Sequence, residues 1–193
     1  CGTFTPEVRH MGNTTDPALG SIAAQLETSR NYDSPPLHLW HPPLSGDIPI
    51  HINAQGDWYH DGSKIAREAL VRLFANILRR ERDGEYYLVT PTEKWRIEVE
   101  QHALLVTDVD AFEVDGVQHL AATLNTGKRI QVSEQQPLFL DDESGEIAAL
   151  RLPHGLTAIF TRAAWYRLVD MADIEHDFAV LKSGNSVFRL RTV

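Results

Sequence analysis

The chain has 193 residues, of which 42% are hydrophobic, so it can bury one sizeable core or two smaller cores that share an interface. Its 27 acidic and 18 basic residues give a net charge of −9, which disfavours a nucleic-acid partner. No stretch approaches the roughly 18 consecutive apolar residues of a membrane-spanning helix, so we expect a soluble globular protein without a membrane span.

The first residue is the single cysteine, Cys1, so an internal disulfide is excluded and a reducing compartment is favoured. We therefore expect a cytoplasmic protein. As an alternative, an amino-terminal cysteine is what a bacterial lipoprotein keeps after signal cleavage, and Cys1 would then carry a lipid anchor. A further alternative is that residues 1–10 are an upstream extension and that Met11 is the native start. The sequence gives no indication of the oligomeric state.

Residues 1–36 are predicted to form a tail that contains a short helix and a linker. Asp16 and Pro17 suit the N-cap and first position of a helix that runs to about Ser29. Residues 31–36 are rich in Pro, Ser, Asn and Asp, which is typical of a linker.

The segment from His38 to Pro43 contains a tryptophan, two histidines and two prolines. Tandem prolines fix φ and push the preceding residue toward extended geometry, so this segment is expected to be a rigid loop of the kind that binds ligands. The isoleucines at 48, 50 and 52 then alternate with other residues as in a strand, and residues 53–56 turn the chain into a hairpin. Pro49 predicts that this strand lies at a sheet edge.

A helix is predicted from a Ser63 cap to about Leu78, with the basic cluster at 79–82 at its end. Strands at 86–90 and 95–99 complete an amino-terminal subdomain of residues 37–100. The carboxy-terminal subdomain, residues 101–193, is expected to be barrel-like. Its predicted elements are strands at 104–109, 112–114, 117–124, 129–132, 147–152 and 187–190, and a helix at 161–172. The fold class is therefore α+β, with two main amphipathic helices and a mostly antiparallel, curled sheet or barrel.

A weak internal repeat relates the two main helices. A shift of 95 residues places Arg67, Ala69, Arg72 and Leu73 over Arg162, Ala164, Arg167 and Leu168, which makes a duplication plausible. A helical projection puts Arg67 and Arg162 at the edges of the apolar faces, near free helix amides, so together they could form an anion site. Alternatively, each arginine pairs with an acid such as Asp47 or Glu93.

Metal and catalytic interpretations are weaker. His38 and His41, with Asp47, His51 and His60 nearby, could be drawn as a metal site, but i, i+3 spacing on a proline-bound loop does not align two imidazoles. The phosphate-loop, dinucleotide-binding, nucleophile-elbow and zinc-protease motifs are absent. The sequence therefore predicts no metal and no cofactor, assigns no catalytic residue, and leaves enzyme activity as the less favoured possibility.

Several ordered motifs carry a resemblance to a known family. They are His38-Leu39-Trp40-His41-Pro42-Pro43, Gly46-Asp47-Ile48, Leu70-Val71-Arg72-Leu73-Phe74, Val89-Thr90-Pro91-x-Glu93-Lys94 and Arg162-x-x-x-Tyr166-x-Leu168-Val169. From about Leu37 to Leu190 the chain resembles the bacterial family called domain of unknown function 1285. The resemblance implies a duplicated two-part fold with a carboxy-terminal part that is superficially like a pleckstrin-homology domain. It also implies a site for a nucleotide-like ligand between the two parts and a role in signalling.

The leading functional hypothesis is a sensory protein that binds a small anionic or nucleotide-like ligand between its two subdomains. One alternative is an enzyme that acts on a phosphorylated or nucleotide substrate and uses His38, His41 or Asp47 for proton transfer. The other alternative is a protein-interaction domain. The candidate ligand-binding residues are His38, Trp40, His41, Asp47, Arg67, Glu93, Lys94 and Arg162.

Overall fold

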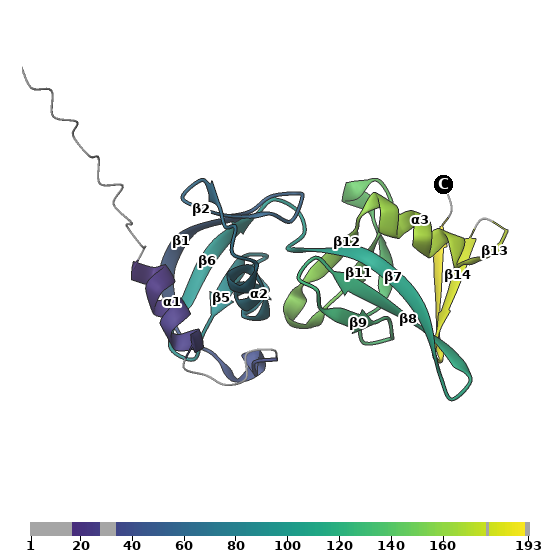
Figure 1. Cartoon of the computed structure of the whole chain (residues 1–193), viewed down its shortest axis with the longest axis horizontal. Coiled ribbons are helices and arrows are strands. Elements are labelled where there is room, and N and C mark those ends of the chain that lie inside the picture. Colours follow the sequence, from purple (N-terminus) through teal and green to yellow (C-terminus); the bar gives the residue numbers. More distant parts are fainter. Residues whose placement is uncertain (1–16, 28–33, 177, 192–193) are drawn as a thin grey trace, which may run out of the picture.

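The computed structural model describes residues 17–27, 34–176 and 178–191. The predicted cap at Asp16, the helix end at Ser29 and both interpretations of the amino terminus lie outside these residues. In Figure 1 the two halves lie side by side along the long axis of the molecule. The elements of the amino-terminal half are α1 (Pro17–Glu27), η1 (Leu37–Leu39), β1 (Leu44–Ile52), β2 (Trp58–His60), β3 (Ser63–Lys64), α2 (Glu68–Asn76), β4 (Leu78–Arg80), β5 (Tyr86–Val89) and β6 (Lys94–Val99).

The carboxy-terminal half follows directly and is richer in strands. Its elements are β7 (Leu104–Val114), β8 (Val117–Leu124), β9 (Arg129–Gln131), β10 (Leu138–Asp141), η2 (Asp142–Ser144), β11 (Ile147–Arg151), η3 (Pro153–Gly155), β12 (Thr157–Phe160), α3 (Arg162–Asp170), β13 (Asp173–Glu175), β14 (Phe178–Ser183) and β15 (Ser186–Arg191). The fold is α+β, as the sequence predicts.

The strands of the amino-terminal half form a six-stranded sheet in the order β3-β2-β1-β6-β5-β4. The predicted hairpin is present, with Ile50 opposite His60 and Ile52 opposite Trp58. The prediction that Pro49 marks an edge strand is wrong, because β1 also pairs in parallel with β6. The pairing with β6 shifts register between Asp47 and His51, and this irregularity accommodates a residue that has no amide hydrogen.

The amphipathic helix α2 is shorter than its apolar pattern predicts. Ser63 does not cap it but starts strand β3, and the helix begins at Glu68 after Arg67, whose side chain makes no capping hydrogen bond. The helix ends at Asn76, so the basic cluster at 79–82 does not lie in its last turn. Leu78 and Arg79 instead belong to edge strand β4, which pairs with β5.

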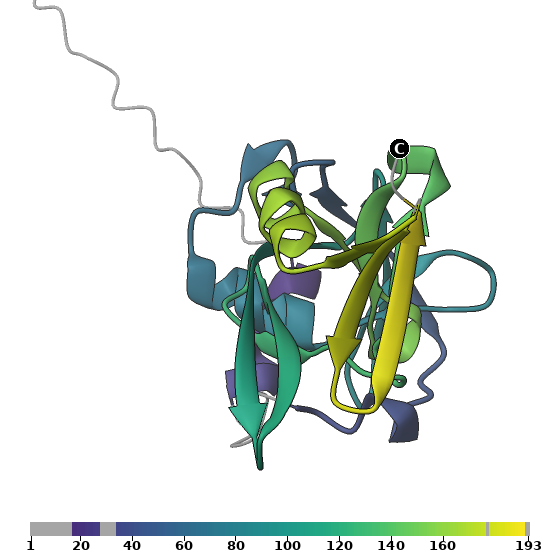
Figure 2. The same cartoon turned by 90° about the vertical axis from the view of Figure 1, so that its right-hand side faces the viewer.

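The carboxy-terminal half contains a six-stranded sheet, β10-β11-β12-β7-β8-β9, and a three-stranded sheet, β13-β14-β15. Both sheets are open, so the predicted barrel is not closed. The two strands predicted at 104–109 and 112–114 are one continuous strand, β7, since residues between them also pair with β8. Figure 2 shows the smaller sheet beside the β7–β8 hairpin. The buried Ser183 hydroxyl joins the two, because it donates to the carbonyl of Val132 and accepts from the amide of Leu120.

The duplication is present in the structure as a repeated helix followed by three antiparallel strands. The first copy is α2-β4-β5-β6 and the second is α3-β13-β14-β15. Adding 95 to the bounds of β4, 78 and 80, gives 173 and 175, which are the bounds of β13. The two copies differ in attachment, because β6 pairs with β1 in the large sheet whereas β13–β15 form a separate sheet.

Two close backbone approaches join the halves. A Cβ added to Gly155 of η3 would lie 2.6 Å from the carbonyl oxygen of Arg80 in β4. A Cβ added to Gly56 would lie 2.8 Å from the side-chain amide nitrogen of Asn125, which follows β8. The buried hydrophobic residues of both halves belong to one cluster. The two halves are therefore closely packed at Gly155 and at Gly56.

Candidate functional site

The loop that carries Trp40 is anchored by hydrogen bonds from Arg79 of β4. The Arg79 guanidinium donates from Nη1 to the carbonyl oxygens of Leu37, at 3.2 Å, and Trp40, at 2.9 Å. Its Nη2 donates to Glu81 at 2.5 Å. The Arg79 side chain is only 13% exposed, so these bonds are well shielded from water. The expected rigid loop thus has an anchor that its own sequence does not contain.

The anchor continues into a half-buried charge network that includes Lys94, one of the predicted site residues. Lys94 donates to Glu81 at 3.1 Å and lies 4.8 Å from the centre of the Tyr87 ring. Burial alone would raise the pKa of Glu81, but hydrogen bonds from Arg79 and Lys94 hold this pKa below its usual value. Burial, followed by the hydrogen bond to Asp83, raises the pKa of Tyr87 to about 12. Lys94 therefore stabilises Glu81, the acidic partner of the Arg79 side chain that anchors the Trp40 loop.

Two further predicted site residues, Asp47 and Glu93, form hydrogen bonds with other side chains of the protein. The Asp47 carboxylate accepts two hydrogen bonds from Arg96, at 2.7 and 2.9 Å, and side-chain hydrogen bonding to Arg96 is the main reason that the pKa of Asp47 is lowered. Glu93 accepts from Ser21 at 3.0 Å and from Gln25 at 2.9 Å, both on α1. Asp47 is thus held in an ion pair, which removes support for its use as a catalytic base.

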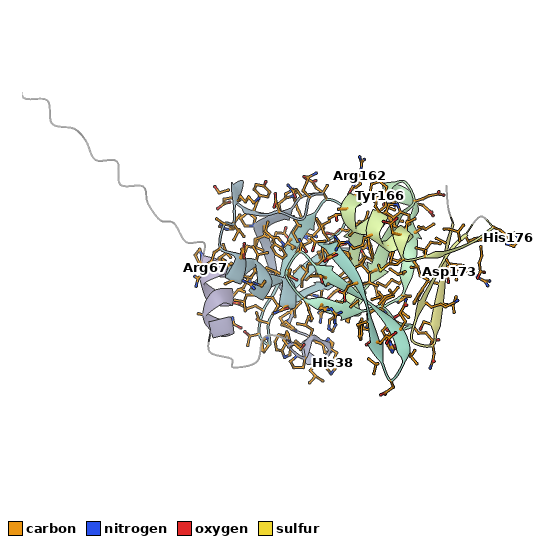
Figure 3. All side chains as sticks on the ribbon, turned by 45° about the vertical axis from the view of Figure 1, so that its right-hand side comes forward. His38, Arg67, Arg162, Tyr166, Asp173 and His176 are labelled. Atoms are coloured by element: carbon orange, nitrogen blue, oxygen red, sulfur yellow. The ribbon has the colours of Figure 1, made fainter. Side chains whose placement is uncertain are left out.

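The expected arginine pair is not formed. Arg67 and Arg162 are both exposed, and Arg67 is the N-cap residue of α2, so neither arginine points into the core. Figure 3 shows the two side chains in different parts of the molecule, with His38 in a third place. Neither arginine pairs with Asp47 or Glu93, since those acids have the partners described above. Helix α2 starts at Glu68, later than the predicted cap at Ser63, so Arg67 precedes its first residue. Helix α3 starts at Arg162 close to the predicted position, and Arg162 lies exposed in its first turn.

Two neighbouring cavities lie between the amino-terminal and carboxy-terminal halves. The smaller has a volume of about 180 Å³, and the larger has a volume of about 590 Å³. Thr126, in the turn between β8 and β9, lines both of them. Ser34, Pro35 and Leu37, just before the Trp40 loop, line the smaller cavity. The segment that leads into the loop therefore forms one wall of the space between the halves, whereas no residue of the predicted loop His38–Pro43 lines either cavity.

The smaller cavity brings together basic groups that sequence analysis missed. Lys128 and His154 line it, and neither forms an ion pair with an acidic side chain of the described residues. Burial lowers the pKa of His154, and the positive charges of Arg79, His38 and Lys128 lower it further. Of the predicted site residues, His38 is thus the one that lies close enough to this cavity to act on it electrostatically.

The backbone at His154 is strained. His154 has φ 60° and ψ 31°, in the left-handed region that residues with a side chain seldom adopt, and Gly155 follows with φ 73°. The contact of Gly155 with the Arg80 carbonyl fixes η3 against β4. Strain of this kind in a rigid setting is found at ligand sites more often than elsewhere. The Pro-His-Gly sequence was the available signal, since proline and glycine around a histidine predict a tight turn.

The largest cavity, about 1020 Å³, is a wide groove over the amino-terminal sheet that also reaches Glu143. Ion pairs occupy much of its surface: Asp47 binds Arg96, and His51 contacts Glu100 at 2.9 Å. Within the described part of the chain no three histidine, cysteine or acidic residues are grouped so that they could hold a metal ion. We therefore place the candidate site at the smaller cavity between the halves.

Comparison with known proteins places the chain in a family. A model of the N-terminal domain of a domain of unknown function, DUF1285, matches residues 35–102, and a model of the DUF1285 C-terminal domain matches residues 103–190. The chain belongs to the DUF1285 family. This confirms the resemblance that the sequence motifs carry. Comparison with curated proteins found no match.

Two solved structures of DUF1285 proteins are similar to this chain. One, from Silicibacter pomeroyi DSS-3 at 2.50 Å resolution, is 35% identical, covers 89% of this chain and 95% of its own, and has a TM-score of 0.77. The other, from Shewanella baltica OS155 at 1.40 Å, is 32% identical, covers 64% of this chain and 91% of its own, and has a TM-score of 0.53. None of the helices described here combines the length and apolar character needed to cross a membrane.

Proposed function

We propose that this DUF1285 protein binds a small anionic ligand in the smaller cavity between its halves. One observation carries the proposal: Lys128 and the half-buried His154 line a largely aliphatic cavity, and neither has an acidic partner among the described residues. A bound anion would offset the mutual repulsion of these groups.

The position of the cavity supports a sensory role. Its walls come from the segment before the Trp40 loop, from α2 and β4 of the first half, and from β7, β8 and η3 of the second. A ligand that contacts both halves stabilises their association, because it binds the joined arrangement better than a loosened one. This linkage between occupancy and domain contact is what a protein of signal transduction requires.

Nucleotide-like ligands are the larger molecules to be tested, and they need more room than the smaller cavity offers. The neighbouring cavity of about 590 Å³ falls in the range of about 300 to 1,000 Å³ that is usual for cofactor-sized molecules. Trp58 contributes to its lining, and the buried indole Nε1 of Trp58 has no hydrogen-bond partner among the described residues. A nucleotide would have to occupy both cavities past Thr126 to bring its phosphate to Lys128.

A thermal-shift screen of the full chain tests the proposal. The panel contains nucleoside monophosphates, inorganic phosphate and small carboxylates, each against wild type, Lys128→Gln and Arg162→Gln. We expect at least one anion to raise the melting temperature of wild type by several degrees at saturating concentration. This shift should be lost in Lys128→Gln and kept in Arg162→Gln, whose charge lies away from the cavity. If no anion stabilises wild type, the proposed function is wrong.

A further inference from the structure

We propose that the occupant of the smaller cavity is an apolar monocarboxylate, with its tail among the aliphatic side chains and its carboxylate at Lys128 and His154. This inference rests on the proposed function and narrows it to one chemical class. It follows from three features of the cavity, namely its size and lining, its supply of donors, and the geometry of η3.

The size and lining favour a short apolar tail. At about 180 Å³ the cavity is smaller than the roughly 300 Å³ at which pockets for drug-sized ligands begin. Most of its walls are aliphatic and come from both halves: Leu37, Leu78, Leu104, Leu124, Ile130 and Leu156. The polar lining is limited to a few groups, among them Ser34, Asn76 and Thr126, so a ribose or a base placed there would replace only part of its hydrogen bonds to water, which is costly. A short hydrocarbon chain would gain from the same surroundings.

The donors at the cavity match a carboxylate better than a phosphate. Among the described residues no arginine lines the cavity, and Lys128 and His154 are the charged or chargeable donors there. Arg79 lies close by, but its Nη1 and Nη2 atoms already donate to Leu37, Trp40 and Glu81. Phosphate groups are usually met by an arginine fork or by several backbone amides. One ammonium and one imidazolium are sufficient for the two oxygens of a carboxylate.

The turn at η3 holds the imidazole in place for this contact. Gly155 packs against the Arg80 carbonyl, and His154 is kept in the left-handed conformation immediately before it. The histidine therefore lines the cavity from a backbone that has little freedom to move away. A positioned donor binds an anion with less loss of conformational entropy than a mobile one.

The test is isothermal titration calorimetry of the full chain with four probes: hexanoate, its neutral amide hexanamide, adenosine monophosphate and inorganic phosphate. We expect hexanoate to bind, and hexanamide, which has the same tail without the charge, to bind at least tenfold more weakly. Adenosine monophosphate and phosphate should give no binding heat. The comparison of hexanoate with hexanamide separates recognition of the charge from recognition of the tail.

Three variants locate the binding. Asparagine tolerates left-handed backbone, so His154→Asn removes the imidazole without adding strain. We expect His154→Asn and Lys128→Gln each to weaken hexanoate binding by about tenfold to a hundredfold, as is usual for a hydrogen bond to a charged group. Arg162→Gln removes an exposed charge elsewhere and should leave the affinity unchanged. Far-ultraviolet circular dichroism and the melting temperature of each ligand-free variant verify its folding.

Each result has one meaning. Hexanoate binding that depends on Lys128 and His154 supports the inference. Binding of adenosine monophosphate or phosphate without hexanoate overturns the inference and leaves the proposed function standing. Hexanoate binding that both folded variants retain also overturns it, because the carboxylate would then lie elsewhere. If none of the four probes binds and the wider anion panel also fails, both the inference and the proposed function are wrong.

Discussion

Arg79 Nη1 lies 2.9 Å from the carbonyl oxygen of Trp40. This hydrogen bond ties edge strand β4 to the Trp40 loop, which directly follows the cavity-lining residue Leu37. The same guanidinium binds Glu81, which also accepts from Lys94. The prolines predict that this loop is rigid. The loop is also fixed by the guanidinium of Arg79, which lies 39 residues after Trp40 in the chain.

Replacing Arg79 tests this anchor. Arg79→Met removes the donors and leaves two carbonyl groups and Glu81 without their partner in a half-buried setting. We expect the free energy of unfolding to fall by roughly 2 to 4 kcal/mol, measured by urea denaturation. Limited proteolysis should cut the 34–44 segment faster. Arg82→Met, at an exposed neighbour, is the control and should change little; equal behaviour of the two variants would refute the anchor.

Gly155→Ala tests the contact between the halves. An alanine there meets both the positive φ of 73° and the Arg80 carbonyl at 2.6 Å. Gly116→Ala is a matched control, because Gly116 has φ 76° with open space around it. The control should lose about 1 to 2 kcal/mol from backbone strain alone. Gly155→Ala should lose a further 1 to 3 kcal/mol, roughly, from the overpacked contact. Equal losses in denaturant unfolding would mean that the approach at η3 is not rigid.

Asp141 gives the fold a dependence on acid. Burial alone would raise the pKa of Asp141, but the adjacent Ser144 and His102 favour the carboxylate and lower the pKa below its usual value. His102 Nε2 lies 3.4 Å from Asp141 Oδ2, while Nδ1 contacts Thr157 at 2.8 Å. A lowered folded-state pKa means that this stabilisation is complete above the unfolded-state pKa and is lost as the pH falls through the folded-state value.

Asp141→Asn should therefore be less stable than wild type near neutral pH, and the difference should shrink as the pH falls from about 5 to about 2. Urea midpoints measured across this range check the effect. Asp142→Asn, at the exposed neighbouring position, should keep the wild-type dependence on pH. A constant difference between Asp141→Asn and wild type at all pH values would show that the carboxylate is not the titrating group.

Anion binding should strengthen as the pH falls. In the free protein the pKa of His154 is lowered by burial and by the charges of Arg79, His38 and Lys128. A bound carboxylate favours the imidazolium and raises this pKa, so binding takes up a proton. Affinity for hexanoate should thus rise between about pH 8 and about pH 6, as calorimetry can measure. His154→Asn should abolish the dependence; an unchanged dependence in that variant would assign it to another group.

Much of the fold could be predicted because periodicity reports on burial. The hairpin at β1–β2, the strands β5, β6 and β8, and the helix α3 follow from apolar spacing and turn residues. Predictions failed where tertiary contacts outweigh local pattern. Leu78 continues the helical spacing of α2, yet it pairs with Leu88 in a sheet, since strand pairing with β5 buries it completely.

The candidate site was less predictable because it depends on packing between the halves. Arg67 and Arg162 were expected to form an anion site, but both are exposed. The residues before β1 that line the cavity are Ser34, Pro35 and Leu37, which precede the predicted His38–Pro43 loop. The sequence around His154 predicts a tight turn but not a cavity, and an isolated lysine in a turn, such as Lys128, is a common surface residue. Only the approach of η3 and the β8–β9 turn to the first half brings them together.

The central claim is that an anion binds at His154, and nuclear magnetic resonance of the imidazole groups tests it most directly. The chain has nine histidines, and comparison with His154→Asn assigns the signal of His154. On titration with hexanoate we predict that the His154 signals move toward the protonated form, that those of His38 shift less, and that the exposed His176 does not respond. A His154 signal that stays unchanged at saturating hexanoate, phosphate and nucleotide would contradict the account.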